Sequence, residues 1–341
     1  MPTFADFLQE PCQHCCPLFS NIDLNHTPGK KNEGEEIALR GIYDSVSWME
    51  YFYIWPGLSA VIYALAAMVM KRALTEGFGV IRFTFICNLV LALFFLLPAL
   101  FSEGGWSWVG WEWATLCGVF FFLGQLTTAF ALRYGDVSIQ SPLMGSKVVF
   151  VALFSAVLGF ELVESMWWAA AFMTTMAVFL LGYSNRGKGG KTWISVGFAL
   201  ASAGSFAVSD VFIMGKAESY GVIQFLAMEM VVLLVLSLGL IPFFRREVSS
   251  ITRTAWRFGL IASGLMAVQA IILNMALGVY QHATPFNVIY STRGLWSILL
   301  VLWIGRQMGT DELGGVHRRL IVRRLLGAMI LFVAVVLVFW E

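Results

Sequence analysis

Charged side chains are scarce in this sequence of 341 residues. Lys, Arg, Asp and Glu together make up 13% of the chain, about half of the roughly 25% that is usual in soluble domains. The formal net charge is only +1 and no strongly basic domain is present, which argues against nucleic-acid binding. The low charge, together with a hydrophobic content of 59%, predicts an integral membrane protein.

Patterns typical of catalysis and cofactor binding are missing as well. No Gly-rich phosphate loop of the Walker type occurs, so we expect no ATP-driven motor in the chain. Four His residues are present, and His282 and His317 stand alone without paired acids or metal-ligand spacing. A membrane enzyme acting on lipid-linked substrates would need such a constellation. We therefore expect no enzyme and no cofactor.

Cysteine is rare, with five residues in the chain. Cys87 and Cys117 lie in apolar segments, where we expect them to act as small packing residues. The other three belong to the sequence CQHCC at 12–16, whose spacing matches no standard zinc pattern, so we expect no metal site. Residues 1–48 are polar, and we expect a disordered N-terminal tail or a mis-called start, because Met49 opens a stretch typical of the beginning of a membrane protein.

Long apolar stretches dominate the rest of the chain. A spanning helix needs about 20 predominantly apolar residues. Candidate spans lie at 52–70, 79–101, 107–132, 137–160, 163–183, 192–214, 222–244, 255–280, 285–305 and 320–340. Because backbone polar groups in lipid must bond within the protein, each span is expected to be a helix. The predicted fold class is all-α integral membrane, with ten transmembrane helices.

The two halves of the chain resemble each other. The stretch MKRALTEGFGVIRF at 70–83 is similar to MGKAESYGVIQF at 214–225. Chance similarity between two apolar halves is the alternative. The matching spans predict a first repeat at 49–183 and a second at 192–340. Since each repeat holds five helices, an odd number, the second repeat enters the membrane from the opposite side, which gives an inverted repeat typical of transporters.

Two cations occupy corresponding positions within these halves. Lys147 precedes Gly159 by twelve residues, and Arg293 precedes Gly305 by the same distance. A charge at the centre of a membrane helix costs about 2.5–3.5 kcal/mol on insertion scales, so such residues usually face the interior of the bundle. We expect the pair to bind an anion, because Arg clamps a carboxylate or phosphate with two bonds and Lys acts as a point charge.

An ion pair between Lys147 and an intramembrane acid, either Glu229 or Asp210, is the structural alternative. The same two acids are candidates for a proton-coupling group. Further polar side chains near the cations are expected to contact substrate, although such residues also serve as interhelical hydrogen bonds. These candidate substrate contacts are Gln125, Gln269, Asn274, Ser146, Thr292 and Tyr290.

The segment SPLMGSKVVFVALFSAVLGFELVE, with Pro142, Gly159 and Glu161, resembles the fourth helix of the drug/metabolite transporter superfamily, in particular its EamA-like ten-helix branch. Arg82 and the stretch AFALRYGDVS also match that branch. The resemblance covers 52–340 in two halves and implies a ten-helix transporter. Gln307 stands where the family usually has a closing Glu. The two cations look more like those of the organophosphate and nucleotide-sugar branches, where basic residues in helices 4 and 9 bind phosphate.

These observations predict a secondary-active transporter of small polar, anionic metabolites that works by alternating access in the lipid bilayer. The alternative is an exporter of neutral or cationic amino acids or drugs, in which Lys147 is locked in a structural ion pair with Glu229. Lys and Arg gather in the odd-numbered loops, which places these in the cytoplasm and both termini outside. The related transporters often have cytoplasmic termini. We expect a multi-pass protein of the plasma (inner) membrane, as a monomer or homodimer.

Overall fold

The computed structural model of the chain describes residues 53–101, 109–135, 140, 143–182, 190–244, 251–304 and 318–338. Helices make up all the regular structure of these residues, as the sequence predicted. The expected tail at 1–48 and the CQHCC sequence lie outside the described residues. The same is true of Pro142, Gly305, Gln307 and His317.

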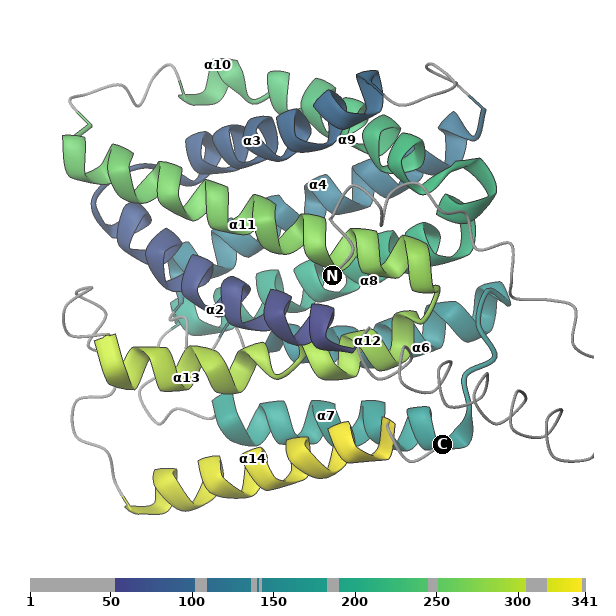
Figure 1. Cartoon of the computed structure of the whole chain (residues 1–341). Helices are drawn as coiled ribbons and strands as arrows, with labels where there is room; N and C mark the ends of the chain where they lie inside the picture. Colours follow the sequence, from purple (N-terminus) through teal and green to yellow (C-terminus); the bar gives the residue numbers. More distant parts are fainter. Residues whose placement is uncertain are drawn as a thin grey trace, which may run out of the picture. The chain divides into compact units, whose positions relative to one another are not determined.

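The helices follow the predicted spans closely (Figure 1). Those of the first half are α2 (Ile54–Thr75), α3 (Val80–Leu100), α4 (Trp111–Tyr134), the 3-10 turn η2 (Met144–Ser146), α6 (Lys147–Leu158) and α7 (Ser165–Gly182). Those of the second half are α8 (Gly190–Tyr220), α9 (Val222–Leu238), α10 (Ile241–Phe244), α11 (Arg253–Tyr280), α12 (Ala283–Tyr290), α13 (Arg293–Ile304) and α14 (Arg318–Val338).

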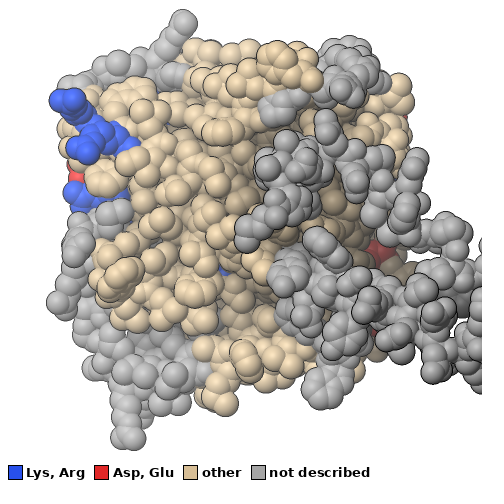
Figure 2. All heavy atoms as spheres, in the orientation of Figure 1, with Lys and Arg blue, Asp and Glu red and all other residues tan. Residues whose placement is uncertain are grey.

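Seven of the described helical segments are long and apolar enough to cross a membrane, and three further apolar helices are shorter. The shorter ones are Met144–Leu158, Ser165–Leu180 and Leu326–Val338. Many large apolar side chains on these helices are exposed, as expected for a surface that contacts lipid. The face in Figure 2 is largely uncharged, and its described Lys and Arg atoms gather mainly at one edge.

Two predicted helices, 137–160 and 285–305, are irregular beside their cations. In the first, the Lys147 amide donates to the Met144 carbonyl in a 3-10 pattern, and α6 begins at Lys147. In the second, the amides of Ser291 and Thr292 donate to carbonyls three residues back, and α13 then begins at Arg293. Lys147 therefore opens a regular helix, whereas the sequence placed it half-way along one. The predicted span 222–244 is also interrupted, because α9 ends at Leu238 and α10 follows.

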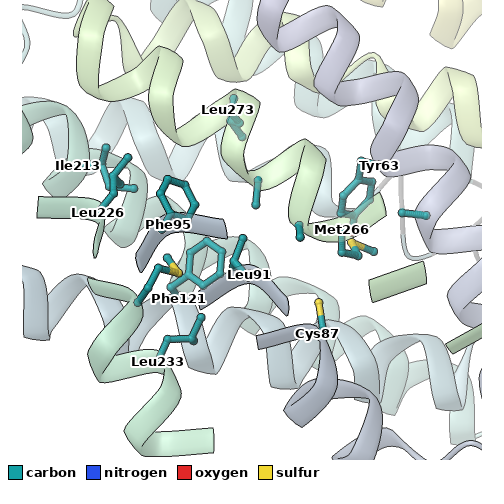
Figure 3. Close-up of a cluster of buried hydrophobic side chains, with 14 of the residues drawn as sticks. Tyr63, Cys87, Leu91, Phe95, Phe121, Ile213, Leu226, Leu233, Met266 and Leu273 are labelled. Atoms are coloured by element: carbon teal, nitrogen blue, oxygen red, sulfur yellow. The ribbon is translucent and has the colours of Figure 1, made fainter. Parts of the chain in front are cut away.

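Helices far apart in the sequence pack closely. The most extensive contacts join α4 to α8 and α2 to α11, and further large contacts join α3 to α9 and α7 to α14. Figure 3 shows the main apolar core, with labelled side chains from α2, α3, α4, α8, α9 and α11. A second cluster, with Val148, Ala170 and Val288 among its members, packs α6 and α12 against α7 and α14. This packing positions the two irregular segments.

Buried hydroxyl and amide groups connect several helices. Ser202 Oγ on α8 donates to the Gly124 carbonyl of α4 at 2.9 Å. Ser59 Oγ on α2 donates to the Gln269 carbonyl of α11, also at 2.9 Å. The Asn88 amide on α3 donates to Ser237 Oγ on α9 at 2.9 Å. Some polar residues of the apolar segments therefore serve as interhelical hydrogen bonds, as the structural alternative predicted.

Candidate substrate cavity

A small cavity lies between α2, α4, α6, α8, α11, α12 and α13. It is lined by Tyr63, Phe121, Gln125, Thr128, Lys147, Phe206, Asp210, Met266, Gln269, Ala270, Leu273, Asn274, Tyr290 and Arg293. The centre of a water molecule can occupy a volume of about 20 Å³ inside it. A single water requires roughly 10–15 Å³ by this measure, so the cavity has room for one or two waters. In this conformation it is narrow.

Lys147 forms a buried ion pair with Asp210 across the cavity. The Lys147 Nζ and Asp210 Oδ2 atoms are 2.5 Å apart, and their side chains are 4% and 3% exposed. Asn287 Nδ2 donates to the same carboxylate oxygen at 2.8 Å. The pair therefore joins α6, α8 and α12. The partner of Lys147 is Asp210, so the alternative pairing of Lys147 with Glu229 is wrong.

Arg293 is held between aromatic rings at the same cavity. Its guanidinium carbon lies 4.6 Å from the ring centre of Tyr63 and 4.2 Å from that of Tyr290, within the range of a cation–π interaction. Its Nη2 donates to the Met144 carbonyl of η2 at 2.8 Å. Lys147 Nζ lies 5.5 Å from the Tyr290 ring as well, so one tyrosine faces both cations.

Neutral polar groups complete the lining. Tyr290 Oη donates to Gln269 Oε1 at 2.8 Å, and Gln269 Nε2 donates to the Met266 carbonyl at 3.2 Å. Gln125 has a long contact of 4.0 Å with Cys87 Sγ. The Asn274 Nδ2 atom is buried and has no hydrogen-bond partner in the described part of the structure. It is thus a donor that a substrate entering this cavity can use.

Six of the eight predicted substrate contacts line the cavity, as does one of the two predicted proton-coupling residues, Asp210. Ser146 and Thr292 are not among the lining residues. Ser146 Oγ donates to the Leu143 carbonyl of its own turn at 2.8 Å, and Thr292 is half-buried. Glu229 also lies away from the lining, where Ser209 Oγ donates to its Oε1 at 3.3 Å.

Several lining residues were not predicted as site residues. Met266 lies one helical turn from Gln269, so helical spacing was a signal that could have found it. Tyr63 and Phe206 carried no such signal. Aromatic residues are common along the membrane helices, and only the packing shows which rings face a cation.

Glu161 joins the end of one irregular segment to the start of the other. It follows α6, and its Oε2 accepts from the Thr284 amide at 3.2 Å and from Thr284 Oγ1 at 2.6 Å, at the beginning of α12. Burial raises the pKa of this carboxyl above its ordinary value, and the two Thr284 hydrogen bonds oppose that shift. The acid that closes the helix-4 motif therefore serves as an anchor for the start of α12.

The raised pKa of Glu161 predicts a pH-dependent gain in stability for Glu161→Gln. A carboxyl with a raised folded pKa loses stability as the pH rises through that value, whereas Gln keeps an acceptor oxygen and does not ionise. We expect the variant to melt at a higher temperature than wild type at pH 8. The difference should shrink towards pH 4, near the ordinary Glu pKa of about 4.3. Melting of the purified protein in detergent across this range measures the effect.

The partner variant Thr284→Val gives the opposite sign in the same assay. It removes the hydroxyl that favours the ionised carboxylate, so its melting temperature should fall more at pH 8 than at pH 4. A lower melting temperature of Glu161→Gln at pH 8 would show instead that the charge of Glu161 stabilises the fold.

Comparison with known proteins agrees with this architecture. Residues 51–183 match the model of the EamA-like transporter family. Among the solved structures, 28 chains match. One is a crystal structure of a protein that is 16% identical and covers 82% of this chain and 97% of its own, with a TM-score of 0.52. At this identity the similarity shows a shared fold alone. The comparison with curated proteins gives no match.

The apolar helices and the family match indicate a multi-pass integral membrane protein, and residues 51–183 are similar to a family of transporters. The match over 51–183 confirms, for this part of the chain, the resemblance to EamA-like transporters seen in the helix-4 motif.

Proposed function

We propose that this protein is a secondary-active transporter of small anionic metabolites that works by alternating access. The observation that supports it best is the meeting of Lys147 and Arg293 at one narrow cavity inside the helix bundle. Two buried cations at a single site favour an anionic ligand. Arg293 offers a planar set of donors to a carboxylate or phosphate, and Lys147 adds a point charge. Such a transporter needs neither catalysis nor a resident cofactor.

The proposed architecture is ten helices in two inverted five-helix repeats. The packing supports it, because the contact between α4 and α8 has a counterpart between α2 and α11 when the two halves are exchanged. The contacts of α3 with α9 and of α7 with α14 are each their own counterpart, because exchanging the halves only swaps the two helices of the pair. Hydrogen bonds join the same exchanged helices, since Ser202 of α8 donates to a carbonyl of α4 and Ser59 of α2 donates to a carbonyl of α11. Both cations also follow a 3-10 turn.

Contacts across the cavity join the two proposed halves. Lys147 of the first half pairs with Asp210 of the second, and Arg293 of the second donates to Met144 of the first. In alternating access the halves rock about a fixed site, so these contacts must break or rearrange as the cavity opens. Asp210 is the better proton-coupling candidate of the two acids, because Glu229 does not line the cavity.

Ligand-dependent stability tests the proposal. The purified protein is melted with pyruvate, lactate, alanine, lysine or choline. A ligand at one hundred times its dissociation constant adds about 2.7 kcal/mol to stability. We expect only the anions to raise the melting temperature. The matched variant Lys147→Met with Asp210→Asn removes both charges of the ion pair at nearly constant shape and should respond far less.

The alternative, an exporter of neutral or cationic compounds with Lys147 in a structural ion pair, predicts a different result. Alanine, lysine or choline would then stabilise the protein, and the doubly substituted variant would respond as wild type does. That outcome would refute the anion proposal. A plasma-membrane location, termini on the outside and a monomeric or homodimeric state complete the proposal. The loop charges are what favours termini on the outside.

A further inference from the structure

The charges that line the cavity do not cancel. Of its fourteen described lining residues, Lys147 and Arg293 are cationic and Asp210 is the acid, which leaves a formal excess of one positive charge. Asp210 is fixed in place, because Lys147 and Asn287 both donate to its Oδ2. In this conformation the carboxylate is therefore part of the surface that an incoming anion meets.

We infer that Asp210 sets the charge selectivity of the cavity and restricts it to singly charged anions. This inference rests on the proposed anion site and adds the class of anion that the site accepts. Asp210 acts here as a specificity residue. The two cations attract the anion, and the Asp210 carboxylate repels any second negative charge that the anion carries.

The physical reason is the cost of an uncompensated charge inside a protein. An anion with one negative charge balances the excess positive charge and leaves the cavity neutral. An anion with two charges leaves one negative charge unbalanced and close to the fixed carboxylate of Asp210. An unpaired buried charge is strongly unfavourable, and so are two like charges side by side. The cavity should therefore discriminate against dianions such as doubly ionised phosphate esters.

Glu229 provides a matched control, because it is a second buried carboxyl close to Asp210. It lies on α9, accepts from Ser209, the residue before Asp210, and is absent from the cavity lining. Removing the Glu229 carboxyl should leave the charge of the lining unchanged. If the anion preference changes when Asp210 is substituted but not when Glu229 is, the preference is set by the charge of the cavity lining. A change in both variants would indicate a general effect of buried negative charge.

Methanesulfonate and sulfate are the probes that test this inference. They share a tetrahedral shape, carry one and two negative charges, and stay fully ionised at pH 8. Dissociation constants come from the dependence of the melting temperature on probe concentration. Wild type should bind methanesulfonate at least about tenfold more tightly than sulfate. Asp210→Asn should reverse this order, and Glu229→Gln should keep it.

A double variant keeps the test decisive if Asp210→Asn does not fold. Lys147→Met with Asp210→Asn removes one charge of each sign, so the lining keeps its excess of one positive charge and should keep the wild-type order. Equal or tighter binding of sulfate by wild type, a reversed order in the double variant, or an unchanged order in a folded Asp210→Asn would each overturn the inference. If neither probe binds wild type, the proposed anion site itself fails.

Discussion

Replacing Lys147 alone with Met should lower the free energy of unfolding by about 3–5 kcal/mol. The substitution keeps an unbranched side chain of similar length but removes the ammonium that lies 2.5 Å from Asp210 Oδ2. The Asp210 carboxylate then stays buried without its cation, and it still accepts a hydrogen bond from the Asn287 amide. An uncompensated buried charge accounts for most of the expected loss, because a buried pair contributes little net stability when both partners are considered together.

Adding Asp210→Asn to Lys147→Met should restore most of that stability. The double variant holds no charge at either position, so the two substitutions are strongly non-additive and the cycle gives a coupling energy of several kcal/mol. Equilibrium unfolding in mixed micelles titrated with sodium dodecyl sulfate measures all four proteins of the cycle. Additive effects of the two substitutions would contradict a buried ion pair. These unfolding measurements test only whether the ion pair stabilises the fold. The anion-transport proposal is tested separately, by measuring ligand binding to the double variant.

The joint position of Lys147 and Arg293 could be predicted from the sequence. The equal distance of each cation from its glycine indicated equivalent places in two similar halves, and the structure places both cations at one cavity. The glutamines at 125 and 269, 144 residues apart, meet at the same cavity. If the proposed repeat holds, such pairs are predictable, because a repeated sequence folds into repeated elements whose equivalent positions face each other at the interface between repeats.

Residues next to the cations in the sequence were harder to assign. Ser146 and Thr292 precede Lys147 and Arg293, and neither lines the cavity. Consecutive helical residues point about 100° apart, so a neighbour of a cavity residue usually faces another helix. The Ser146 hydroxyl also donates a hydrogen bond to the Leu143 carbonyl of its own turn, and this local bond competes with contacts across the bundle.

The partner of Lys147 could not be chosen from the sequence, because Asp210 and Glu229 both lie in apolar helices. Which acid reaches the lysine depends on how α8 is rotated, and that rotation is set by contacts such as Ser202 to the Gly124 carbonyl. The interruption before Arg293 was equally hidden. Gly145 precedes Lys147 as a possible helix breaker, whereas Ser291 and Thr292 are neither Gly nor Pro.

Substituting Arg293 with Lys should weaken anion binding by about 30-fold to several thousand-fold. The variant keeps one positive charge but loses the planar guanidinium, which lies 4.6 and 4.2 Å from two tyrosine ring centres. Lys does not reproduce stacked, two-bond recognition of a carboxylate or phosphate. Losing a buried, hydrogen-bonded charge contact of this kind costs about 2–5 kcal/mol, which corresponds to that range of affinities.

Arg82→Lys is the matched control for this experiment, since Arg82 is also a buried arginine and does not line the cavity. Its Nη1 donates to the Phe78 carbonyl at 2.9 Å, near the start of α3. Methanesulfonate affinity, measured by thermal stabilisation, should fall in Arg293→Lys and stay unchanged in Arg82→Lys. Equal affinity in wild type and Arg293→Lys would mean that the guanidinium contributes only its charge. The hydrogen bond from Arg293 to the Met144 carbonyl would then serve only to hold two helical segments together. Lys147 would remain the cation that sets anion affinity.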